Sequence, residues 1–453
     1  MKKILSLLLC SLLILNLFAC GAKSETTVTT EAVATQDLIV SGKAPEGKLL
    51  VGFGRVNISP PANGKTELFG YGSPADDSRL FTSMLDPIYG TCVAITDTEG
   101  NTALIYTMDT LYTLAKEVNA IRAEITKRTG IPGENVIISG THTHSSVYYT
   151  ALQDEVNKMA QAAEEALTDR GVATVQTGKT DILGMNFVRH YYNDQGVIVG
   201  DNFGSYSNPV TEHVTEADTQ LQMIRFVREG EQKDILMANW QVHPKLASGG
   251  DTESGLANRN FLSADFIGFT RMEIEKKTDC LFAYYSGACG NVNPTSRISS
   301  EWAQVSTVVN EYGLDFAGRV MAAMDGLQDT QAGMVKTQQT ILQANVFNYG
   351  KYPNRHPEME LTAIRIGNIG FAAVPFEMFD TSGMQLKEGS DCETTFVLTN
   401  ASCEEHEYIP NIEVWDYDTN DQTPYEIFSC AHEKGTAEQV VQELVKMLNE
   451  LGK

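Results

Sequence analysis

The chain has 453 residues, and its 34 Lys and Arg against 58 Asp and Glu give a formal net charge of −24. This charge argues against a nucleic-acid-binding protein, because such proteins need a basic face that displaces counterions from the phosphate backbone. Hydrophobic residues make up 42% and charged residues 20%, which is typical of a globular protein with a sizeable core. Eight cysteines in this length are too few for a scaffold that depends on disulfides.

The N-terminus has the pattern of a bacterial lipoprotein signal peptide. Lysines at positions 2 and 3 precede an apolar run over residues 4–19, which is shorter than the roughly 20 residues of a membrane-spanning helix. The run ends in Leu-Phe-Ala-Cys-Gly at 17–21, which resembles a lipoprotein cleavage site. We therefore expect residues 1–19 to be removed on export. Acylated Cys20 would then anchor the protein to the bacterial cell membrane on its extracytoplasmic side. A plain secretory signal with an incidental cysteine is the alternative.

Residues 20–48 are rich in Thr, Ala, Ser and small charged residues, which is typical of a flexible tether. From residue 49 to residue 453, short apolar runs alternate with amphipathic segments. The predicted helices cover 117–128, 151–170, 266–277, 302–327 and 437–451. The predicted strands cover 103–108, 136–139, 173–176, 221–227, 235–242, 281–285, 340–347, 361–366 and 370–374. This alternation predicts an α/β fold with mixed sheets flanked by helices.

Only eight histidines occur, and their placement after predicted strands is informative. His142 and His144 follow one strand, and residues i and i+2 of an extended chain point to the same side. His243 and Glu377 follow two others. Because α/β sheets usually build ligand sites at the carboxyl ends of strands, and catalytic zinc takes His and carboxylate ligands, these residues predict a metal site there. Structural histidines and a glutamate that complements a helix dipole are the alternative.

Several motifs, taken in order, resemble those of the neutral, non-lysosomal ceramidases. The match begins with Val-Gly-Phe-Gly-Arg-Val-Asn-Ile-Ser-Pro-Pro at 51–61 and continues with Thr-His-Thr-His-Ser at 141–145. Asn-Trp-Gln-Val-His-Pro at 239–244, Gly-Asn-Val-Asn-Pro at 290–294 and Val-Pro-Phe-Glu at 374–377 follow in the family's order. The resemblance covers roughly residues 49–430, and an ordered run of motifs is more specific than any single one.

The resemblance implies a zinc-dependent hydrolase of linear amide bonds, acting on an N-acyl lipid or a related small amphiphile. It assigns four zinc ligands, which are His142, His243, Glu377 and Tyr408. The zinc would lower the pKa of a bound water and polarise the substrate carbonyl. Tyr408 is also compatible with a tyrosine in an irregular surface loop.

The resemblance assigns four further residues to catalysis and substrate binding. His144 would act as a general acid or base or hydrogen-bond the carbonyl oxygen, and Arg189 would bind a hydroxyl or acidic head group of the substrate. Tyr425 and Asn293 would assist the oxyanion, although a surface-loop position suits Tyr425 as well. The family has serine where this chain has Asn293, which excludes a serine alkoxide at this position. The Asn amide can still donate to a developing oxyanion.

The match is to the shorter bacterial branch of the family, so we expect one catalytic domain over 49–453 without the family's C-terminal immunoglobulin-like domain. Two alternatives have no catalytic role. One is a lipid-anchored substrate-binding protein, and the other is a degenerate ceramidase-like binding module.

Overall fold

The computed structural model describes residues 42–61, 66–69, 80–147, 153–200, 209–250, 252–258, 260–298, 306–347, 356–404, 407–417, 419 and 423–453. The predicted signal peptide at 1–19, Cys20 and the tether up to residue 41 lie outside the described residues. The end of the predicted tether contacts the folded body, because the Ala44 N–H donates to the carbonyl oxygen of Asp97 (2.9 Å). Among the helices that the structure describes, none is long and apolar enough to cross a membrane.

The described residues form one large mixed sheet of nine strands. In spatial order these are β16 (Cys280–Ser286), β14 (Asp234–Trp240), β13 (Gln220–Arg228), β8 (Gly171–Asp181), β1 (Leu49–Asn57), β4 (Tyr89–Thr96), β5 (Thr102–Met108) and β6 (Val136–Gly140), with β18 (Gln328–Thr330) paired to β8. The strand pairs at the two ends, β14 with β16 and β5 with β6, are parallel, and the five pairings between them are antiparallel.

A second sheet packs against the first. It contains β19 (Val335–Gln343), β20 (Glu358–Ile366), β21 (Ile369–Ala373) and β23 (Thr394–Leu398). Apolar side chains from both sheets form a common buried cluster, in which Ile105 and Ile224 of the large sheet lie with Phe371 and Phe396 of the small one. Burial of this shared apolar surface is the main favourable contribution to the packing of the two sheets.

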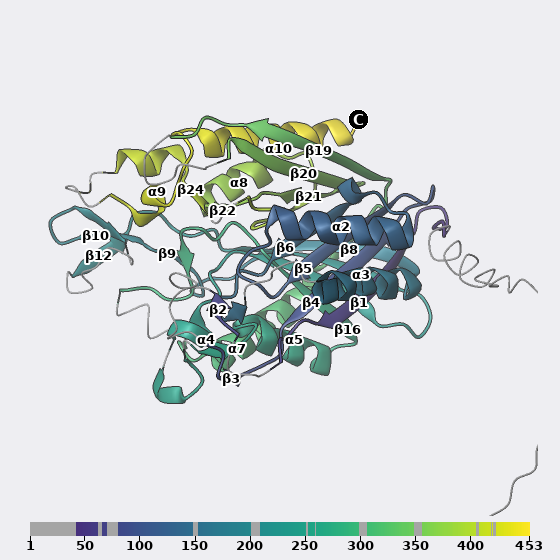
Figure 1. The fold of residues 1–453 in the computed structure, drawn as a ribbon, viewed down its shortest axis with the longest axis horizontal. Coiled ribbons are helices and arrows are strands. Elements are labelled where there is room, and N and C mark those ends of the chain that lie inside the picture. Colours follow the sequence, from purple (N-terminus) through teal and green to yellow (C-terminus); the bar gives the residue numbers. More distant parts are fainter. Residues whose placement is uncertain are drawn as a thin grey trace, which may run out of the picture.

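Helices cover the outer faces of both sheets. The large sheet carries α2 (Ala115–Thr129) and α3 (Gln153–Thr168) on one part and α5 (Phe266–Lys277) and α7 (Val309–Ala323) on another, while α8 (Asp380–Gly389) and α10 (Thr436–Leu451) cover the small sheet. The result is four layers in the order helices, sheet, sheet and helices, and Figure 1 shows α10 over β19 and β20 along one side. The α/β class with mixed sheets flanked by helices is therefore confirmed.

Shorter elements complete the fold. The short strands are β2 (Leu68–Phe69), β3 (Ser83–Met84), β7 (Ser146–Val147), β9 (Phe187–Val188), β10 (His190–Asn193), β11 (Ile198–Gly200), β12 (Val210–His213), β15 (Phe261–Leu262), β17 (Val292–Asn293), β22 (Glu377–Met378) and β24 (Tyr408–Ile409). The short helices are α4 (Leu246–Gly249), α9 (Tyr425–Phe428) and the 3-10 turns Gly133–Asn135, Thr252–Ser254, Met324–Gly326 and Ile412–Asp416.

Three predicted elements differ clearly from the observed bounds. The strand predicted over 173–176 is β8, which covers Gly171–Asp181. The helix predicted over 302–327 begins at Val309 and ends at Ala323, and its first predicted residues lie partly outside the described chain. The strand predicted over 340–347 is β19, which covers Val335–Gln343. The prediction missed the first residues of β19 because they are mostly polar, and a run of polar residues resembles a loop in the sequence.

The large sheet twists and curls until its two edges approach each other. An odd number of antiparallel pairings separates β6 from β16, so these strands would point in opposite directions in a flat sheet. Neighbouring strands are rotated by about 20–25° relative to each other, which adds up to roughly 140–175° over the seven neighbouring pairs. This rotation brings the directions of β6 and β16 close to parallel. The Tyr285 hydroxyl on β16 indeed donates to the carbonyl oxygen of Ile105 on β5 (3.0 Å). The twist therefore lets the carboxyl ends of β6 and β14 face a common region.

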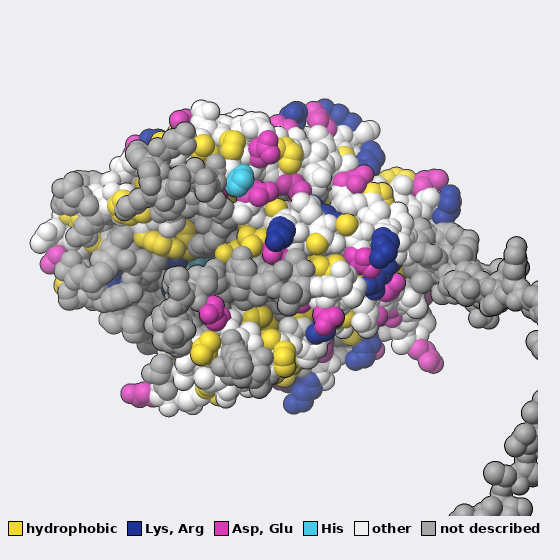
Figure 2. All heavy atoms as spheres, in the orientation of Figure 1, with side chains coloured by type: hydrophobic (Ala, Val, Ile, Leu, Met, Phe, Trp, Pro, Cys, Tyr) yellow, Lys and Arg dark blue, Asp and Glu magenta, His cyan; other side chains and the backbone are white. Residues whose placement is uncertain are grey.

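On the face drawn in Figure 2, described Lys and Arg side chains are interspersed with Asp and Glu side chains. This distribution gives no continuous basic stripe over the described part of that face.

Candidate metal centre

His142 lies just after β6 in a backbone conformation that residues other than glycine seldom adopt. Its φ is +68°, in the left-handed region. The His142 N–H donates to the carbonyl oxygen of Thr110 (2.8 Å), and the ring Nδ1 lies 2.8 Å from the carbonyl oxygen of Leu111. The loop over 110–111 thus holds both the backbone and the ring of His142, which is fully buried.

His243 is held in the same way by another loop. It follows β14, and both its N–H and its Nδ1 lie within hydrogen-bonding distance of the carbonyl oxygen of Val292, at 3.0 and 3.1 Å. Val292 lies in β17, just beyond the end of β16. A carbonyl oxygen only accepts hydrogen bonds, so in both histidines Nδ1 carries the proton and Nε2 keeps its lone pair.

The carboxylate of Glu377 lies close to the Nε2 atoms of both histidines. Its Oε2 lies 3.0 Å from Nε2 of His142 and 3.1 Å from Nε2 of His243. All three side chains are buried, with at most 1% exposed. Two imidazole nitrogens and a carboxylate oxygen that converge in this way are a donor set that zinc prefers, and carbonyl-anchored imidazoles are typical of metal ligands.

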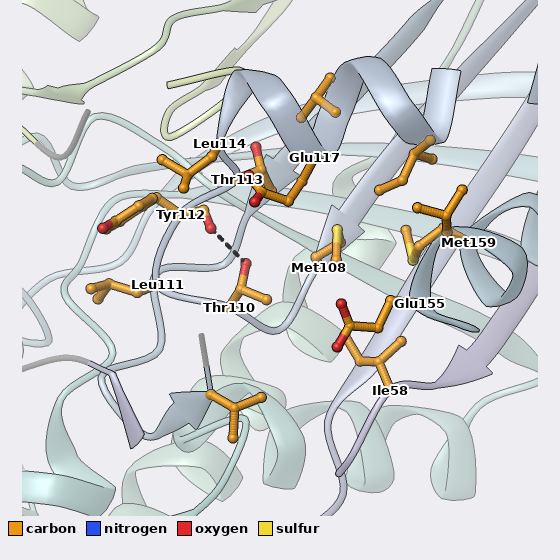
Figure 3. Close-up of a pocket in the computed structure, with 14 residues that line it drawn as sticks. Ile58, Met108, Thr110, Leu111, Tyr112, Thr113, Leu114, Glu117, Glu155 and Met159 are labelled. Carbon is orange, nitrogen blue, oxygen red and sulfur yellow. Dashed lines mark hydrogen bonds between the residues drawn. The ribbon is translucent and has the colours of Figure 1, made fainter. Parts of the chain in front are cut away.

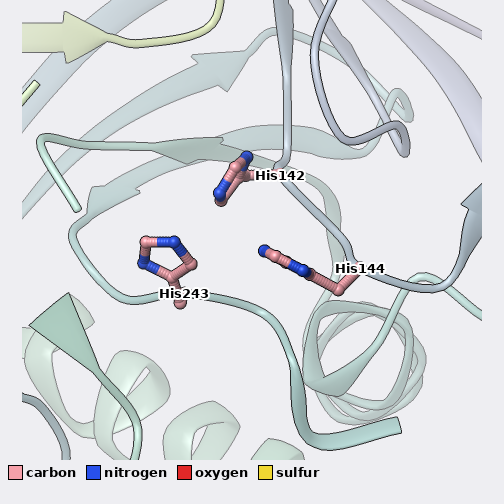
Figure 4. A group of neighbouring side chains, drawn as sticks. All are labelled: His142, His144 and His243. Atoms are coloured by element: carbon pink, nitrogen blue, oxygen red, sulfur yellow. The ribbon is translucent and has the colours of Figure 1, made fainter. Parts of the chain in front are cut away.

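His144 completes a cluster of three histidines around the same space. The ligating atoms of His142, His144 and His243 all lie within 4.8 Å of one another, and Figure 4 shows the three rings facing a common centre. The His144 N–H donates to the carbonyl oxygen of Pro244 (2.9 Å), so the loop that carries His243 also positions His144. Together with the Glu377 oxygen the group offers four donor atoms, one more than a three-ligand site with an open position requires.

Burial favours the neutral form of the His144 and His243 imidazoles. Desolvation lowers the pKa of His243 to about 3, and it lowers the pKa of His144 well below its ordinary value. The neighbouring histidines lower the pKa of His144 further. Metal ligation requires neutral imidazole, so the environment favours the protonation state that a cation needs.

Tyr408 lies opposite Glu377 in a short parallel pairing. Glu377 of β22 is in register with Tyr408 of β24, and the Glu377 N–H donates to the carbonyl oxygen of Glu407 (3.0 Å). Tyr408 is 3% exposed, and burial together with the nearby Glu377 carboxylate raises the pKa of its hydroxyl well above the ordinary value. The structure thus places Tyr408 beside Glu377, another predicted ligand.

Arg189 adjoins the cluster on the side of the two tyrosines. Its guanidinium carbon lies 5.4 Å from the ring centre of Tyr408 and 5.9 Å from that of Tyr425, and its Nε donates to Oε1 of Glu426 (2.8 Å). His190 Nε2 lies 3.4 Å from the same Glu426 oxygen. The positive charge of Arg189 is the main reason that the pKa of Glu426 falls to about 2 despite its burial.

Asn293 lies in β17, a short strand that adjoins both Arg189 and His243. Residues 292–293 of β17 pair antiparallel with residues 187–188 of β9, and the Arg189 N–H donates to the carbonyl oxygen of Asn291 (2.9 Å). Asn293 itself is fully buried. One short ribbon therefore carries Asn293, holds Arg189 and supplies the carbonyl that anchors His243.

The structure gathers the eight predicted site residues into one region, although their chemical roles stay predictions. Sequence reasoning missed Glu426 as the partner of Arg189, because the two lie 237 positions apart and only an acidic residue next to Tyr425 hinted at it. It also missed His190, whose one signal was its position beside Arg189.

A pocket lined by Thr110 and Leu111 adjoins the loop that holds His142 (Figure 3).

Comparisons with known proteins support the fold. No protein-family model and no curated protein matches the sequence. Among solved structures, a ceramidase complexed with C2 matches with a TM-score of 0.68 and 13% identity, over 88% of this chain and 75% of its own. The neutral ceramidase from Pseudomonas aeruginosa matches with a TM-score of 0.69 and 13% identity, over 90% of this chain and 75% of its own. The chain therefore has the neutral ceramidase fold, as the resemblance implied.

Proposed function

We propose that the protein is a zinc-dependent hydrolase that cleaves linear amide bonds in N-acyl amphiphiles. The observation that carries the proposal is the convergence of Nε2 of His142, Nε2 of His243 and Oε2 of Glu377 within about 3 Å, with both Nδ1 atoms anchored on backbone carbonyls. The shared fold with two ceramidase structures supports the same reaction class.

His142, His243 and Glu377 would hold the zinc, with Tyr408 as a fourth ligand. When bound, the ion would activate water and polarise the scissile carbonyl. The chain contributes a dry, rigid setting, because all four side chains are at most 3% exposed. Low exposure strengthens every electrostatic interaction inside the site.

His144 would act as the general base and general acid of the reaction. Its ring centre lies 4.9 Å from that of His142 and 5.5 Å from that of His243, so it borders the cluster. As a neutral imidazole it can accept a proton from the attacking water and deliver it to the departing amine nitrogen. Its side chain is 8% exposed, the largest value among the three histidines, which gives it the access to substrate that this role needs.

Arg189, Asn293 and Tyr425 would bind and orient the substrate. The amide of Asn293 and the hydroxyl of Tyr425 are donors for the oxygen that gains negative charge. The guanidinium of Arg189 lies beside the rings of Tyr408 and Tyr425, where it would bind a hydroxyl or an acidic group of the head group. A lipid-anchored position outside the bacterial cell, through acylated Cys20, would place such a site near membrane-derived amphiphiles.

The test measures zinc content and hydrolysis on purified protein. We expect one zinc per chain and zinc-dependent release of fatty acid from a panel of N-acyl amines, with turnover lost in His142→Ala and kept in the control His356→Ala, an exposed histidine outside the cluster. Zinc-independent turnover, or no turnover of any amide or ester by zinc-loaded protein, would refute the proposal. Tight substrate binding without product would instead identify a binding protein.

A further inference from the structure

Asn291 is a buried amide that joins two segments of the metal centre. It lies directly before β17 and is 3% exposed. Its Nδ2 donates to Oδ1 of Asp380 (2.7 Å), and its Oδ1 accepts from the Asp380 N–H (3.0 Å). Asp380 is fully buried and begins α8, three positions after Glu377. These two hydrogen bonds therefore tie the segment before β17 to the segment that carries the proposed ligand Glu377.

The backbone next to this amide supports the other groups of the site. The carbonyl oxygen of Asn291 accepts from the Arg189 N–H (2.9 Å). The next carbonyl, that of Val292, accepts from the His243 N–H and faces its Nδ1, and Asn293 follows in the same strand. A displacement of this segment would therefore change the support of a proposed ligand and of two residues assigned to the substrate.

The contacts of Asp380 require an amide at position 291. The Asp380 carboxylate also accepts from the N–H groups of Thr381 (2.8 Å) and Asp218 (3.2 Å), so it acts only as an acceptor. Asn291 supplies a donor to this carboxylate and an acceptor to the Asp380 N–H, and an ionised aspartate could supply only the acceptor. An aspartate at 291 would also place two buried carboxylates in direct contact, where they repel each other unless they share a proton.

We propose that Asn291 is a positioning residue of the zinc site. By holding Asp380 it fixes the segment that carries Glu377 relative to the carbonyl oxygen that orients His243. It acts through these neighbours and is not itself a ligand. The inference rests on the zinc ligation of the proposed function and identifies a residue that controls it.

The test measures zinc affinity by competition with a chromogenic chelator, and stability by urea denaturation of the zinc-free protein. We expect Asn291→Ala to weaken zinc binding roughly 10–100-fold, the usual effect of losing a contact that orients metal ligands. Asn291→Asp should weaken it at least as much, because a repulsive contact replaces the hydrogen bond. The milder Asn291→Ser, whose side chain is too short to replace both contacts, should act in the same direction and serves if the alanine variant does not fold.

An exchange of the two side chains separates positioning from general stability. The double variant Asn291→Asp with Asp380→Asn again pairs one amide with one carboxylate and carries one negative charge. It should bind zinc about tenfold more tightly than Asn291→Asp alone, because the two changes are coupled through direct contact. A merely structural role of Asn291 would not produce this recovery of zinc affinity.

Asn239→Ala is the matched control. Asn239 is also 3% exposed, and its Nδ2 donates to the carbonyl oxygens of Tyr285 (3.0 Å) and Val397 (2.9 Å), away from α8 and β17. Its loss should lower the free energy of unfolding and keep zinc affinity within about twofold of the parent value, because sites without shared partners act nearly independently.

Unchanged zinc affinity in the Asn291 variants, an equal loss of affinity in Asn239→Ala, or no recovery in the double variant would each overturn the inference. A parent protein that binds no zinc would refute the proposed function together with this inference. A parent that binds zinc as well as its Asn291 variants do would refute the inference alone.

Discussion

At the scale of single residues, two backbone carbonyls decide which nitrogens the site presents. The carbonyl oxygens of Leu111 and Val292 face Nδ1 of His142 and His243 and leave Nε2 for a ligand. Every residue has a carbonyl, so no sequence motif could reveal these two anchors. The histidines themselves were predictable, because each follows an apolar strand.

The buried ion pair of Arg189 and Glu426 gives a first prediction. Glu426→Gln should lower the free energy of unfolding by about 3–5 kcal/mol, because it leaves the buried guanidinium without a counter-charge. Urea denaturation measures the loss. The double variant Arg189→Met with Glu426→Gln should recover most of it, since no unpaired charge remains. A double variant as unstable as the single one would contradict this interpretation.

Asp86 gives a prediction for pH dependence. Burial raises the pKa of this carboxyl to about 7, while it accepts hydrogen bonds from the Ser263 hydroxyl and the Ala264 N–H. The unfolded chain releases this proton near pH 4, so the free energy of unfolding should fall as the pH rises from about 4 to 7. One such proton contributes a slope of at most about 1.4 kcal/mol per pH unit.

The control for this prediction is Asp86→Asn, which removes the titrating group. Denaturation series at several pH values should show a smaller decline in the variant than in the parent protein between pH 4 and 7. Parallel declines in both proteins would assign the pH dependence to other groups.

At the scale of elements, β22 depends on close backbone packing at Gly290. A Cβ atom at this position would lie 2.8 Å from the carbonyl oxygen of Glu377 and 3.0 Å from that of Met378, so Gly290→Ala must displace the strand that carries the proposed ligand. We expect zinc affinity to fall roughly 10–100-fold, as it does when a supporting contact of a metal ligand is lost.

The matched control is Gly318→Ala in α7, where an added Cβ meets no atom within 4 Å. It should keep zinc affinity and, as a glycine-to-alanine change inside a helix, raise stability by up to about 1 kcal/mol. Competition with a chromogenic zinc chelator measures both affinities. Equal zinc affinity in the two variants would show that β22 tolerates the shift.

The bounds of an element could be predicted where the sequence itself marks the beginning or end of that element. The helix predicted over 266–277 has the observed bounds of α5, and α2 ends at Thr129 before Gly130, whose φ of +75° suits the left-handed cap of a helix. In contrast, β22 and β24 are two residues long and exist because they pair with each other. This pairing depends on the tertiary structure, and two residues are too few to show an alternating hydrophobic pattern in the sequence.

The side chain of Asp265 accepts hydrogen bonds from two segments of the chain. It accepts a hydrogen bond from the Phe266 N–H at the start of α5 (2.9 Å), which is a helix cap. Its other oxygen accepts from the Ala247 N–H (2.6 Å), four residues after His243. The Asp265 carboxylate therefore caps α5 and also holds the loop that follows the proposed ligand His243.

At the scale of the whole molecule, the proposed zinc ligands come from both halves of the large sheet and from the segments around the small one, so metal binding should stabilise the entire fold. At free zinc about a hundredfold above its dissociation constant, the free energy of unfolding should rise by about 2.7 kcal/mol. Thermal unfolding with zinc and with a chelator measures this difference. A His142→Ala and His243→Ala double variant should not respond to zinc, and an equal response would place the ion elsewhere.

The distance along the chain between the groups around Glu377 has a consequence for biosynthesis. A ribosome delivers the polypeptide from its N-terminus, and domains fold as their parts emerge. His142 is released some 235 positions before Glu377, while Tyr408 and Glu426 emerge later still. Between the release of His243 and that of Glu377 the nascent chain therefore holds both ligand imidazoles without their acidic and phenolic companions. The proposed metal site should therefore be completed only late in synthesis.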